Sequence, residues 1–342
     1  MNEKATIRDV AREAGVGIGT VSRVLTGSGP VAPATRRRVL EVVDRLRFRP
    51  SLAGRRLVTG RTMTLGALVP FFTKHYYLEI LRGIEQAASA SDYSLAIYNV
   101  ERPEQALIHL EFLGRAQRVD GLVIIALSGG LISEAYPAGP PFPIVCVDAE
   151  CPDACASISV DHETGMYLAA RHLAGLCHRV IALIDRPQDP VSGELSQARR
   201  DGYRKACEEA NIQIREDLII VSEYSEEGGY EAAGTLLDLP DPPTALACAS
   251  DLQAIGAIRA VRARGLELGF DVAITGYHDV DLAQYVGLTT VRLPALQMGM
   301  TAVFDLIVRL DGLEGAETRA TPPPELIVRE SCGEVRNNSR RR

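Results

Sequence analysis

Three short segments near the start of the chain carry apolar residues at helical spacing. In the first, Thr6 and Asp9 stand three residues apart, which predicts a capped helix start, and one apolar face follows at Ile7, Val10, Ala11 and Ala14. Similar patterns predict a second helix from about Gly17 to Leu25 and a third from about Pro33 to Arg47. Their inward faces are expected to be Val21, Val24 and Leu25, and Val39, Leu40, Val43 and Leu46.

The spacing of Ala11, Gly15 and Val21 predicts that the first two helices form a helix-turn-helix. Helices that cross closely need a small residue at the contact, a glycine at the tight turn and an apolar residue that fixes the second helix. A helical hairpin with no role in DNA binding would show the same pattern. The charge of this segment, given below, favours DNA binding.

From Leu65 onward, short apolar runs alternate with amphipathic segments. The runs are typical of buried parallel strands, and they lie at 65–69, 95–98, 122–125, 144–147, 156–160, 180–184, 218–221, 245–249 and 272–275. Helices are expected between them at 77–90, 104–116, 164–175, 197–210, 227–237 and 252–264. This alternation indicates doubly wound parallel sheets, and about ten strands indicate two of them, with a ligand cleft at the carboxyl ends of the strands.

The expected fold class is therefore an all-α helix-turn-helix head plus an α/β core of two doubly wound parallel-sheet subdomains with a ligand cleft between them. We expect the head at 1–49, a hinge at 50–61, the core at 62–332 and a tail at 333–342. The tail carries no leucine heptads, so we expect no tetramer built by it.

Charge is distributed unevenly along the chain. The net charge is −7, but residues 1–62 hold 13 Lys and Arg against five acidic residues (+8), and the remainder holds 24 against 39 (−15). A basic head on an acidic body is typical of a phosphate-binding module joined to a sensor. No apolar run approaches the roughly 20 residues that span a bilayer, and the first residues contain no apolar signal region. We expect a cytoplasmic protein with no membrane partner.

Seven cysteines are scattered along the chain, mostly inside apolar runs. Cys151 and Cys155 are close enough for a metal site, but no second ligand pair follows at zinc-finger spacing. We therefore expect buried or incidental free thiols and no cofactor, with a redox or metal role of Cys151 and Cys155 as the remote alternative.

The head resembles that of the lactose-repressor (LacI) family in the stretches TIRDVAREAGV (6–16), TVSRVL (20–25) and TRRRVL (35–40). The resemblance implies that the second helix enters the major groove. It also implies that bases are read by Gly17, Ile18, Gly19 and Arg23, and that phosphates are contacted by Thr6, Thr20, Ser22 and Thr26. The fork of an arginine matches the edge of guanine. The family usually has Ser where Gly17 and Ala32 stand; alanine is the poorer helix cap, by about 1 kcal/mol.

Residues 50–58 (PSLAGRRLV) are too few for a stable isolated helix, and Gly54 lowers the helix propensity further. The resemblance implies that paired hinge helices fold in the minor groove, where Leu57 wedges between base pairs and Arg55 and Arg56 contact phosphates. A plain interdomain linker is the alternative.

The resemblance extends through the core, which is similar to the periplasmic-binding-protein-like sensor of the same family at VDGL (119–122) and LTTVR (288–292), among other stretches. It implies that Arg199 grips ligand hydroxyls or a carboxylate, that Asp251 accepts hydrogen bonds from hydroxyls, and that Tyr224 stacks on the ligand. The family's ligand loop is replaced by a segment that includes Thr73, His75, Tyr76 and Tyr77. Here Lys74 and His75 would favour an anionic ligand, although a loop lysine is usually solvated.

Three further acidic residues are weaker candidates for effector contacts: Asp148, Asp161 and Asp279. Helix caps and strand-end turns are an equal alternative for them. The family often has Asp where His278 stands.

These features predict a homodimeric transcription regulator, most simply a repressor, that binds a pseudo-palindromic double-stranded DNA operator and responds to a small-molecule effector. The resemblance implies a sugar or sugar derivative, but the lack of Trp and the low aromatic content (5%) leave a nucleoside, polyol or acid open. An enzyme is not expected, because the chain has no G-x-S-x-G, Walker or H-E-x-x-H motif. A regulator controlled by a protein co-regulator, or a core of the transport-binding type, would also be compatible with this pattern of strands and helices.

Overall fold

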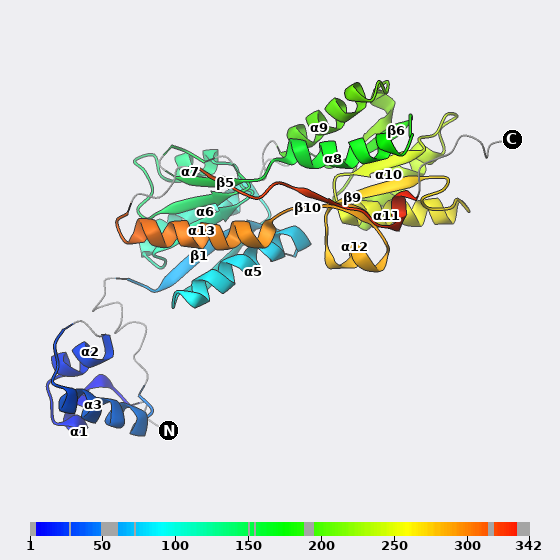
Figure 1. Ribbon diagram of the computed structural model, residues 1–342. Helices are drawn as coiled ribbons and strands as arrows, with labels where there is room; N and C mark the ends of the chain where they lie inside the picture. The colour runs from blue at the N-terminus through cyan, green and yellow to red at the C-terminus, as the bar shows by residue number, and fades with distance from the viewer. Residues whose placement is uncertain are drawn as a thin grey trace. The chain divides into compact units, whose positions relative to one another are not determined.

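The computed structural model describes residues 5–26, 29–48, 61–71, 73–149, 151–153, 155–187, 195–313 and 318–333. They form two compact units (Figure 1). The first comprises residues up to Thr64 together with Gln117–Asp120, and the second comprises the rest. Each unit is considered by itself. In the described part of the chain, no helix is both long and apolar enough to cross a membrane.

The head consists of α1 (Ile7–Ala14), α2 (Ile18–Thr26) and α3 (Pro33–Arg45). The predicted capping box is confirmed: the hydroxyl of Thr6 accepts from the backbone N–H of Asp9, and the Asp9 carboxylate accepts from the backbone N–H of Thr6 at 2.9 Å. Gly15 ends α1 in the left-handed conformation with φ +63°, which glycine adopts without steric cost. The small core of the head is formed by Val10, Ala11, Ala14, Val21, Val24, Val39, Val42 and Phe48.

The third helix differs from its predicted apolar face in one respect. Leu40 was expected to point inward but is 44% exposed, and Val42 is buried instead. The reason is helical period: Val39 and Val42 are three apart and share a face, whereas Leu40 is rotated about 100° from Val39.

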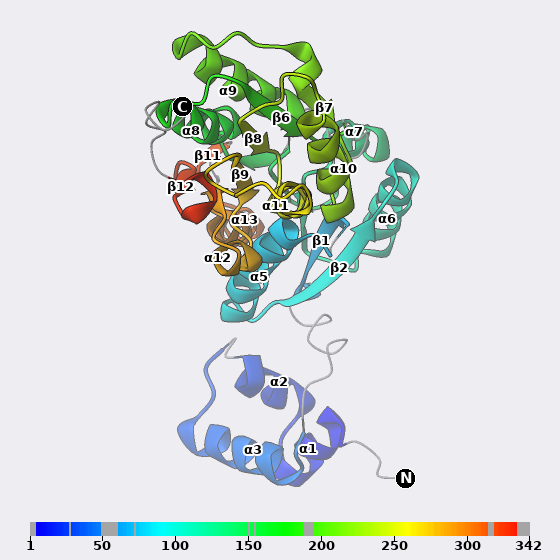
Figure 2. The ribbon, with the colours of Figure 1, turned by 90° about the vertical axis from the view of Figure 1, so that its right-hand side faces the viewer.

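The core contains two sheets (Figure 2). We call each sheet, together with the helices that flank it, a lobe; the first lobe contains the sheet that includes β1, and the second contains the sheet that includes β6. The first sheet has the order β11-β5-β4-β3-β1-β2. Its strands are β1 (Thr64–Pro70), β2 (Ser94–Val100), β3 (Gly121–Ile125), β4 (Ile144–Val147), β5 (Ala156–Ser159) and β11 (Thr318–Ala320). The helices of this lobe are α5 (His75–Ala90), α6 (Pro103–Ala116), α7 (Gly130–Ala135) and α13 (Ala295–Leu310).

The second sheet has the order β12-β10-β9-β8-β6-β7. Its strands are β6 (Ile181–Asp185), β7 (Ile219–Val221), β8 (Ala245–Cys248), β9 (Ala273–His278), β10 (Thr289–Arg292) and β12 (Glu325–Ile327). The lobe also contains α8 (His162–Gly175), α9 (Leu195–Glu209), α10 (Glu226–Leu237), α11 (Asp251–Ala263) and α12 (Asp281–Tyr285), with short 3-10 turns at Glu216–Leu218 and Glu330–Cys332. The predicted two-sheet α/β core is confirmed. The pattern of short apolar runs did not reveal β10, β11 and β12, and β12 pairs antiparallel with β10 rather than parallel.

The chain passes between the lobes where β5 leads to α8, where β10 leads to α13 and where β11 leads to β12. Each lobe is therefore assembled from segments far apart in the sequence. The carboxyl ends of β4, β6 and β9 deliver residues to the space between the lobes, as expected for parallel sheets.

Cys146 and Cys151 form a disulfide with a Cα–Cα distance of 6.0 Å. The expectation of free thiols is wrong for this pair. The chain turns back directly after β4, with Asp148 in the left-handed region at φ +55°, and this turn brings Cys151 beside the strand. Of the other cysteines, Cys177 is exposed, and Cys155, Cys207, Cys248 and Cys332 are buried free thiols.

Candidate functional sites

The start of α2 exposes two glycines and one apolar side chain to solvent. Gly17 and Gly19 are exposed, and a Cβ added at either would meet no atom within 4 Å. Between them, Ile18 is 46% exposed. This end of the helix can therefore approach a flat partner closely and offers one apolar side chain to it.

Arg23 is exposed one turn further along α2, where its Nε donates to the carbonyl of Gly19 at 3.2 Å. Thr20 and Ser22 are half-buried on the same helix. The hydroxyl of Thr6 donates to the Asp9 carboxylate at 2.7 Å, so the capping box holds it. The side chain of Thr26 and the predicted hinge contacts Arg55, Arg56 and Leu57 lie outside the described residues.

In the core, side chains from both lobes surround a small cavity of about 10 Å³, which is roughly the space of one water molecule. The first lobe contributes Lys74, Tyr76, Tyr77 and Asp148, and the second contributes His162, Arg186, Arg199, Tyr224 and His278. Five of the residues predicted for the effector site meet here: Tyr76, Tyr77, Asp148, Arg199 and Tyr224.

Direct contacts join the lobes around this cavity. Asp148 Oδ1 lies 2.8 Å from His162 Nε2, and Lys74 Nζ donates to the carbonyl of Tyr224 at 2.9 Å. The rings of Tyr76 and His278 are tilted against each other with centroids 4.6 Å apart. The two lobes are thus closed on each other at this point.

Asp148 is a buried hub of this network. The hydroxyl of Tyr76 donates to its Oδ2 at 3.0 Å, so both carboxylate oxygens are engaged. Burial raises the pKa of Asp148, but His162, the Tyr76 hydrogen bond and the charge of Arg199 outweigh burial and bring the pKa below its ordinary value. His162 Nδ1 in turn lies 3.1 Å from the hydroxyl of Tyr277.

Gly165 allows Tyr277 to reach His162. A Cβ at this position would lie 2.3 Å from the Tyr277 hydroxyl oxygen, so any larger residue would displace the ring. The glycine is therefore needed for the shape of the pocket and not for a turn.

Arg199 projects from α9 and is only 1% exposed. Its guanidinium lies over the ring of Tyr277, 5.5 Å from the centroid, and its Nη1 is 3.4 Å from His162 Nδ1. Its Nε and Nη2 have no hydrogen-bond partner among the described residues. Buried polar groups are nearly always paired, so this edge of the guanidinium is the feature of the pocket that most calls for a ligand.

Tyr224 and His278 form the aromatic wall of the cavity. The Tyr224 hydroxyl is 2.9 Å from His278 Nδ1. Burial and then the nearby charge of Arg199 hold the pKa of His278 well below its usual value, so this imidazole is neutral at pH 7. A neutral imidazole can accept as well as donate a hydrogen bond.

The remaining predicted residues lie apart from the small cavity. Thr73 is exposed. Asp161 caps α8 by accepting from the backbone N–H of Thr164 at 2.8 Å, which favours the helix-cap alternative. Asp279 binds Arg292 and Arg329 at 2.7 Å each.

Asp251 is 1% exposed and is engaged within the protein. Its Oδ2 accepts from the backbone N–H of Val280 at 2.7 Å, and its Oδ1 accepts from the hydroxyl of Thr290. Burial raises the pKa of Asp251 to about 7. Asp251, which was predicted to bind the effector, therefore does not line the small cavity.

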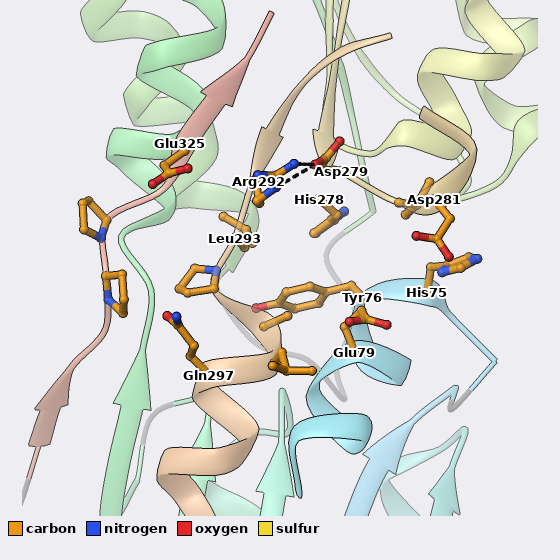
Figure 3. A pocket seen from close by; sticks show the side chains of 16 residues that line it. His75, Tyr76, Glu79, His278, Asp279, Asp281, Arg292, Leu293, Gln297 and Glu325 are labelled. Carbon is orange, nitrogen blue, oxygen red and sulfur yellow. Dashed lines mark hydrogen bonds and ion pairs between the residues drawn. The ribbon is translucent and has the colours of Figure 1, made fainter. Parts of the chain in front are cut away.

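Two larger hollows flank the small cavity. One, of about 400 Å³, contains His75 and Glu79 and shares Tyr76 and His278 with the small cavity (Figure 3). The other, of about 750 Å³, contains Asp161 and Gln197 and shares Asp148 and His162. The small cavity therefore lies between two openings to solvent.

His162 and Arg186 were missed by the sequence analysis. His162 follows β5 closely, and Arg186 directly follows β6. Residues just beyond the carboxyl ends of parallel strands are the usual ligand contacts in such sheets. That rule, applied to each predicted strand, would have found both residues.

Comparison with known proteins finds two family models that match this chain. Residues 6–51 match the family model for bacterial regulatory proteins of the lacI family, and residues 170–332 match that for a periplasmic binding protein-like domain. The HTH-type transcriptional repressor PurR of Haemophilus influenzae (strain PittEE) is 34% identical to this chain over 343 residues, covering 97% of this chain and 99% of the repressor. The chain belongs to the LacI family.

Solved structures of the LacI family share the whole architecture. The lac repressor dimer bound to operator and the anti-inducer ONPF superimposes with a TM-score of 0.85 at 27% identity, over 97% of this chain and 100% of that one. The transcriptional regulator CelR in complex with cellobiose gives 0.71 at 29% identity, over 96% and 99%. The predicted family and fold are confirmed, and the chain is a DNA-binding transcription regulator of the LacI family.

Proposed function

We propose that this LacI-family regulator is a repressor whose affinity for its operator is set by a small carbohydrate or carbohydrate derivative bound between the two lobes. The observation that carries the proposal is the cavity around Arg199, where side chains of both lobes converge on a buried guanidinium edge that has no partner among the described residues. CelR, which is similar over nearly its whole length, has been solved with cellobiose.

At the DNA, α2 is the element that reads bases. The exposed Gly17, Ile18 and Gly19 let the helix lie close to the floor of the major groove, and Ile18 can contact a thymine methyl group. Arg23 supplies the guanidinium fork, with its Nη atoms directed at guanine once its Nε is held by Gly19. Thr20 and Ser22 then contact phosphates, and hinge residues Arg55, Arg56 and Leu57 act in the minor groove.

The working form is a homodimer, because one head covers one half-site and a two-fold axis matches a pseudo-palindromic operator. The similar lac repressor has been solved as a dimer on its operator. The core exposes large apolar side chains that a second copy would cover, among them Leu78, Ile97, Leu282 and Tyr285.

The effector acts by changing the balance between open and closed lobes. Contacts such as Asp148–His162 and Lys74–Tyr224 form only when the lobes meet. A ligand that binds one arrangement better shifts the population towards it, and the dimer transmits the change to the hinges and heads.

Two measurements on the full-length protein test the proposal. The operator is first selected from random DNA, and binding is followed by fluorescence anisotropy. A thermal-shift screen against sugars, sugar phosphates, sugar acids, polyols and nucleosides then identifies the effector. We expect a stabilising compound to change operator affinity at least tenfold, and Arg199→Ala to keep operator binding while losing that response. An Arg199→Ala protein that responds like wild type would place the effector elsewhere, and a core that binds no compound would favour a protein co-regulator.

A further inference from the structure

The disulfide between Cys146 and Cys151 encloses a residue that links the two lobes. Asp148 lies two residues after Cys146 and three before Cys151, inside the ring that the bond closes. Its carboxylate lies 2.8 Å from Nε2 of His162 in the second lobe and accepts from the Tyr76 hydroxyl at 3.0 Å. The bond therefore constrains a segment that takes part in closure of the lobes.

The backbone of Asp148 depends on such a constraint. It lies in the left-handed region at φ +55°, a conformation that residues other than glycine keep only where the surrounding structure fixes it. One fixing contact is the hydrogen bond from its backbone N–H to the carbonyl of Ile158 at 2.7 Å. The disulfide is a second, because it holds the chain on both sides of Asp148. Opening the bond would let this turn relax and move the carboxylate away from His162.

The two sulfur atoms have different surroundings. Cys146 is fully buried in β4, whereas Cys151 is half-buried and lines the hollow of about 750 Å³. A thiol reagent therefore reaches the Cys151 side of the bond from solvent. The reduced pair would also fit, because Cys151 Sγ lies 3.3 Å from the carbonyl oxygen of Ala156, to which a thiol can donate. A buried free cysteine such as Cys146 would behave as a small apolar residue.

The setting of the protein favours a bond that opens and closes. A regulator that binds DNA acts beside the chromosome, where thiol reductants keep most cysteines reduced, and the disulfides found there are mostly transient or redox-sensing. Cys155, the next cysteine in the sequence, is a poor competitor for either sulfur. It is buried, and burial raises the pKa of its thiol, so that little thiolate is present to attack the bond.

We propose that Cys146 and Cys151 form a reversible redox site that couples the thiol–disulfide state of the protein to closure of the lobes. In reduction, a thiolate of the reductant attacks Cys151 Sγ, the S–S bond breaks, and Cys146 leaves as a thiolate that takes up a proton. A second reductant thiol then resolves the mixed disulfide, so that two protein thiols and one reductant disulfide are formed. In oxidation, hydrogen peroxide takes two electrons and two protons from the thiols, which yields the protein disulfide and two water molecules.

The oxidised protein holds Asp148 on His162 and favours closed lobes, whereas the reduced protein opens more readily. This input is separate from the proposed effector, because it acts from the first lobe and needs no ligand in the cavity. Only its effect on operator affinity rests on the proposed function, in which closure of the lobes controls the heads.

The first experiment asks whether the bond opens in the folded, full-length protein. All proteins carry Cys177→Ser, because this exposed thiol would itself react with peroxide or link two copies. The reductant is the neutral dithiol dithiothreitol, since Asp161 and Glu163 line the same hollow and repel anionic thiols. Alkylation followed by mass spectrometry of peptides counts and locates the thiols.

We expect two new thiols, at Cys146 and Cys151, to form without denaturant, and hydrogen peroxide to restore the same bond. A bond that dithiothreitol opens only after urea has unfolded the protein would be purely structural, and the proposal would be wrong. A peroxide-formed bond that involves Cys155 instead would also overturn it.

The second experiment measures closure by hydrogen–deuterium exchange of backbone amides in the second lobe. Two of its segments contact the first lobe: the start of α8 at His162, and residues 222–226, where the Tyr224 carbonyl accepts from Lys74. We expect reduction to speed exchange in both segments by about threefold or more, because opening of the lobes exposes them.

Three variants separate coupling across the lobes from local loosening. Cys151→Ser should exchange fast with or without dithiothreitol, whereas the matched Cys155→Ser should respond like its parent. Asp148→Asn keeps the disulfide and should still yield two thiols, but its second lobe should exchange fast in both redox states. If reduction changed exchange only around the bond, or acted on the second lobe equally in Asp148→Asn, the coupling would be refuted.

Operator binding by the same proteins distinguishes failure of this inference from failure of the proposed function. We expect reduction to change operator affinity by about fivefold or more in the parent and to leave that of Cys151→Ser unchanged. If the second lobe responded to reduction while operator affinity did not, the redox site would stand, and the proposed control of the heads by the lobes would fail.

Discussion

Asp148 at the end of β4 and His162 at the start of α8 form a buried pair, 2.8 Å apart, that links the two lobes. Both side chains are almost fully buried, at 1% and 3% exposure. The pair belongs to the closed arrangement of the lobes, so its strength bears directly on how readily the cleft opens.

Asp148→Asn should weaken this link. We expect the free energy of unfolding at pH 7 to fall by about 1–3 kcal/mol, because a buried carboxylate that engages Tyr76 and His162 through its two oxygens is replaced by an uncharged amide with one acceptor oxygen. The pKa of Asp148 is lowered in the folded protein, so its contribution is present above the unfolded pKa of about 3.9 and is lost as the pH falls through the folded value. Urea unfolding should show the gap between the two proteins narrowing below about pH 4. The exposed Asp153→Asn serves as control, and a constant gap at all pH values would contradict this account.

Asp251 should make stability depend on pH in the opposite sense. Its folded pKa is about 7, well above the unfolded value of about 3.9. Its contribution is fully present below the unfolded pKa and is lost as the pH rises through 7, by about 1.4 kcal/mol per pH unit inside that window. Asp251→Asn removes this loss and can still bind Val280 N–H through its oxygen and Thr290 through its amide. We expect the free energy of unfolding of the variant, relative to that of the wild type, to increase as the pH rises from 5 to 7.

Chemical denaturation at several pH values measures this gain. The exposed Asp92→Asn should follow the wild-type profile. If the difference in free energy of unfolding between Asp251→Asn and wild type stayed constant from pH 5 to 7, the raised pKa of Asp251 would make no contribution to the stability of the second lobe.

The disulfide between Cys146 and Cys151 should contribute to the stability of the first lobe. For so short a loop the chain-entropy model gives about 2 kcal/mol, so dithiothreitol should lower the melting temperature of the wild-type core. Cys151→Ser should be less stable and insensitive to the reductant, whereas Cys155→Ser should keep the wild-type response. A wild-type melting temperature that ignores the reductant would show that the bond adds nothing.

Helix α3 lacks a side-chain cap, and restoring one should stabilise the head. Ala32 is exposed, and its methyl group can make no capping hydrogen bond. The free energy of unfolding of the head should be about 1 kcal/mol higher in Ala32→Thr than in the isosteric Ala32→Val, because only the threonine hydroxyl can accept from the first free N–H groups of the helix. Thermal unfolding followed by circular dichroism compares the two; equal stabilities would mean that this helix end needs no cap.

The success of prediction differed with the range of the interaction. The head was predictable because its capping box, turn glycine and helix faces are local; only Leu40 was misplaced, by one step around the helix. Arg199 and Tyr224 were found through resemblance to a family. His162, the partner of Asp148, was not predicted, because the contact between the two residues depends on how the two lobes close. Asp251 was expected at the ligand, but its two oxygens are taken up by Val280 and Thr290, from segments about 30 and 40 residues away.

The crossing of the chain between the lobes has a consequence for synthesis on the ribosome. The sheet of the first lobe is completed by β11 and that of the second by β12, and both strands lie within residues 318–327. A nascent chain can therefore finish neither lobe until almost all of it has been translated, whereas the head, made of local helices, can fold long before. During elongation the DNA-binding head can therefore fold before the lobes that would regulate it are complete, and the two lobes are completed at nearly the same time.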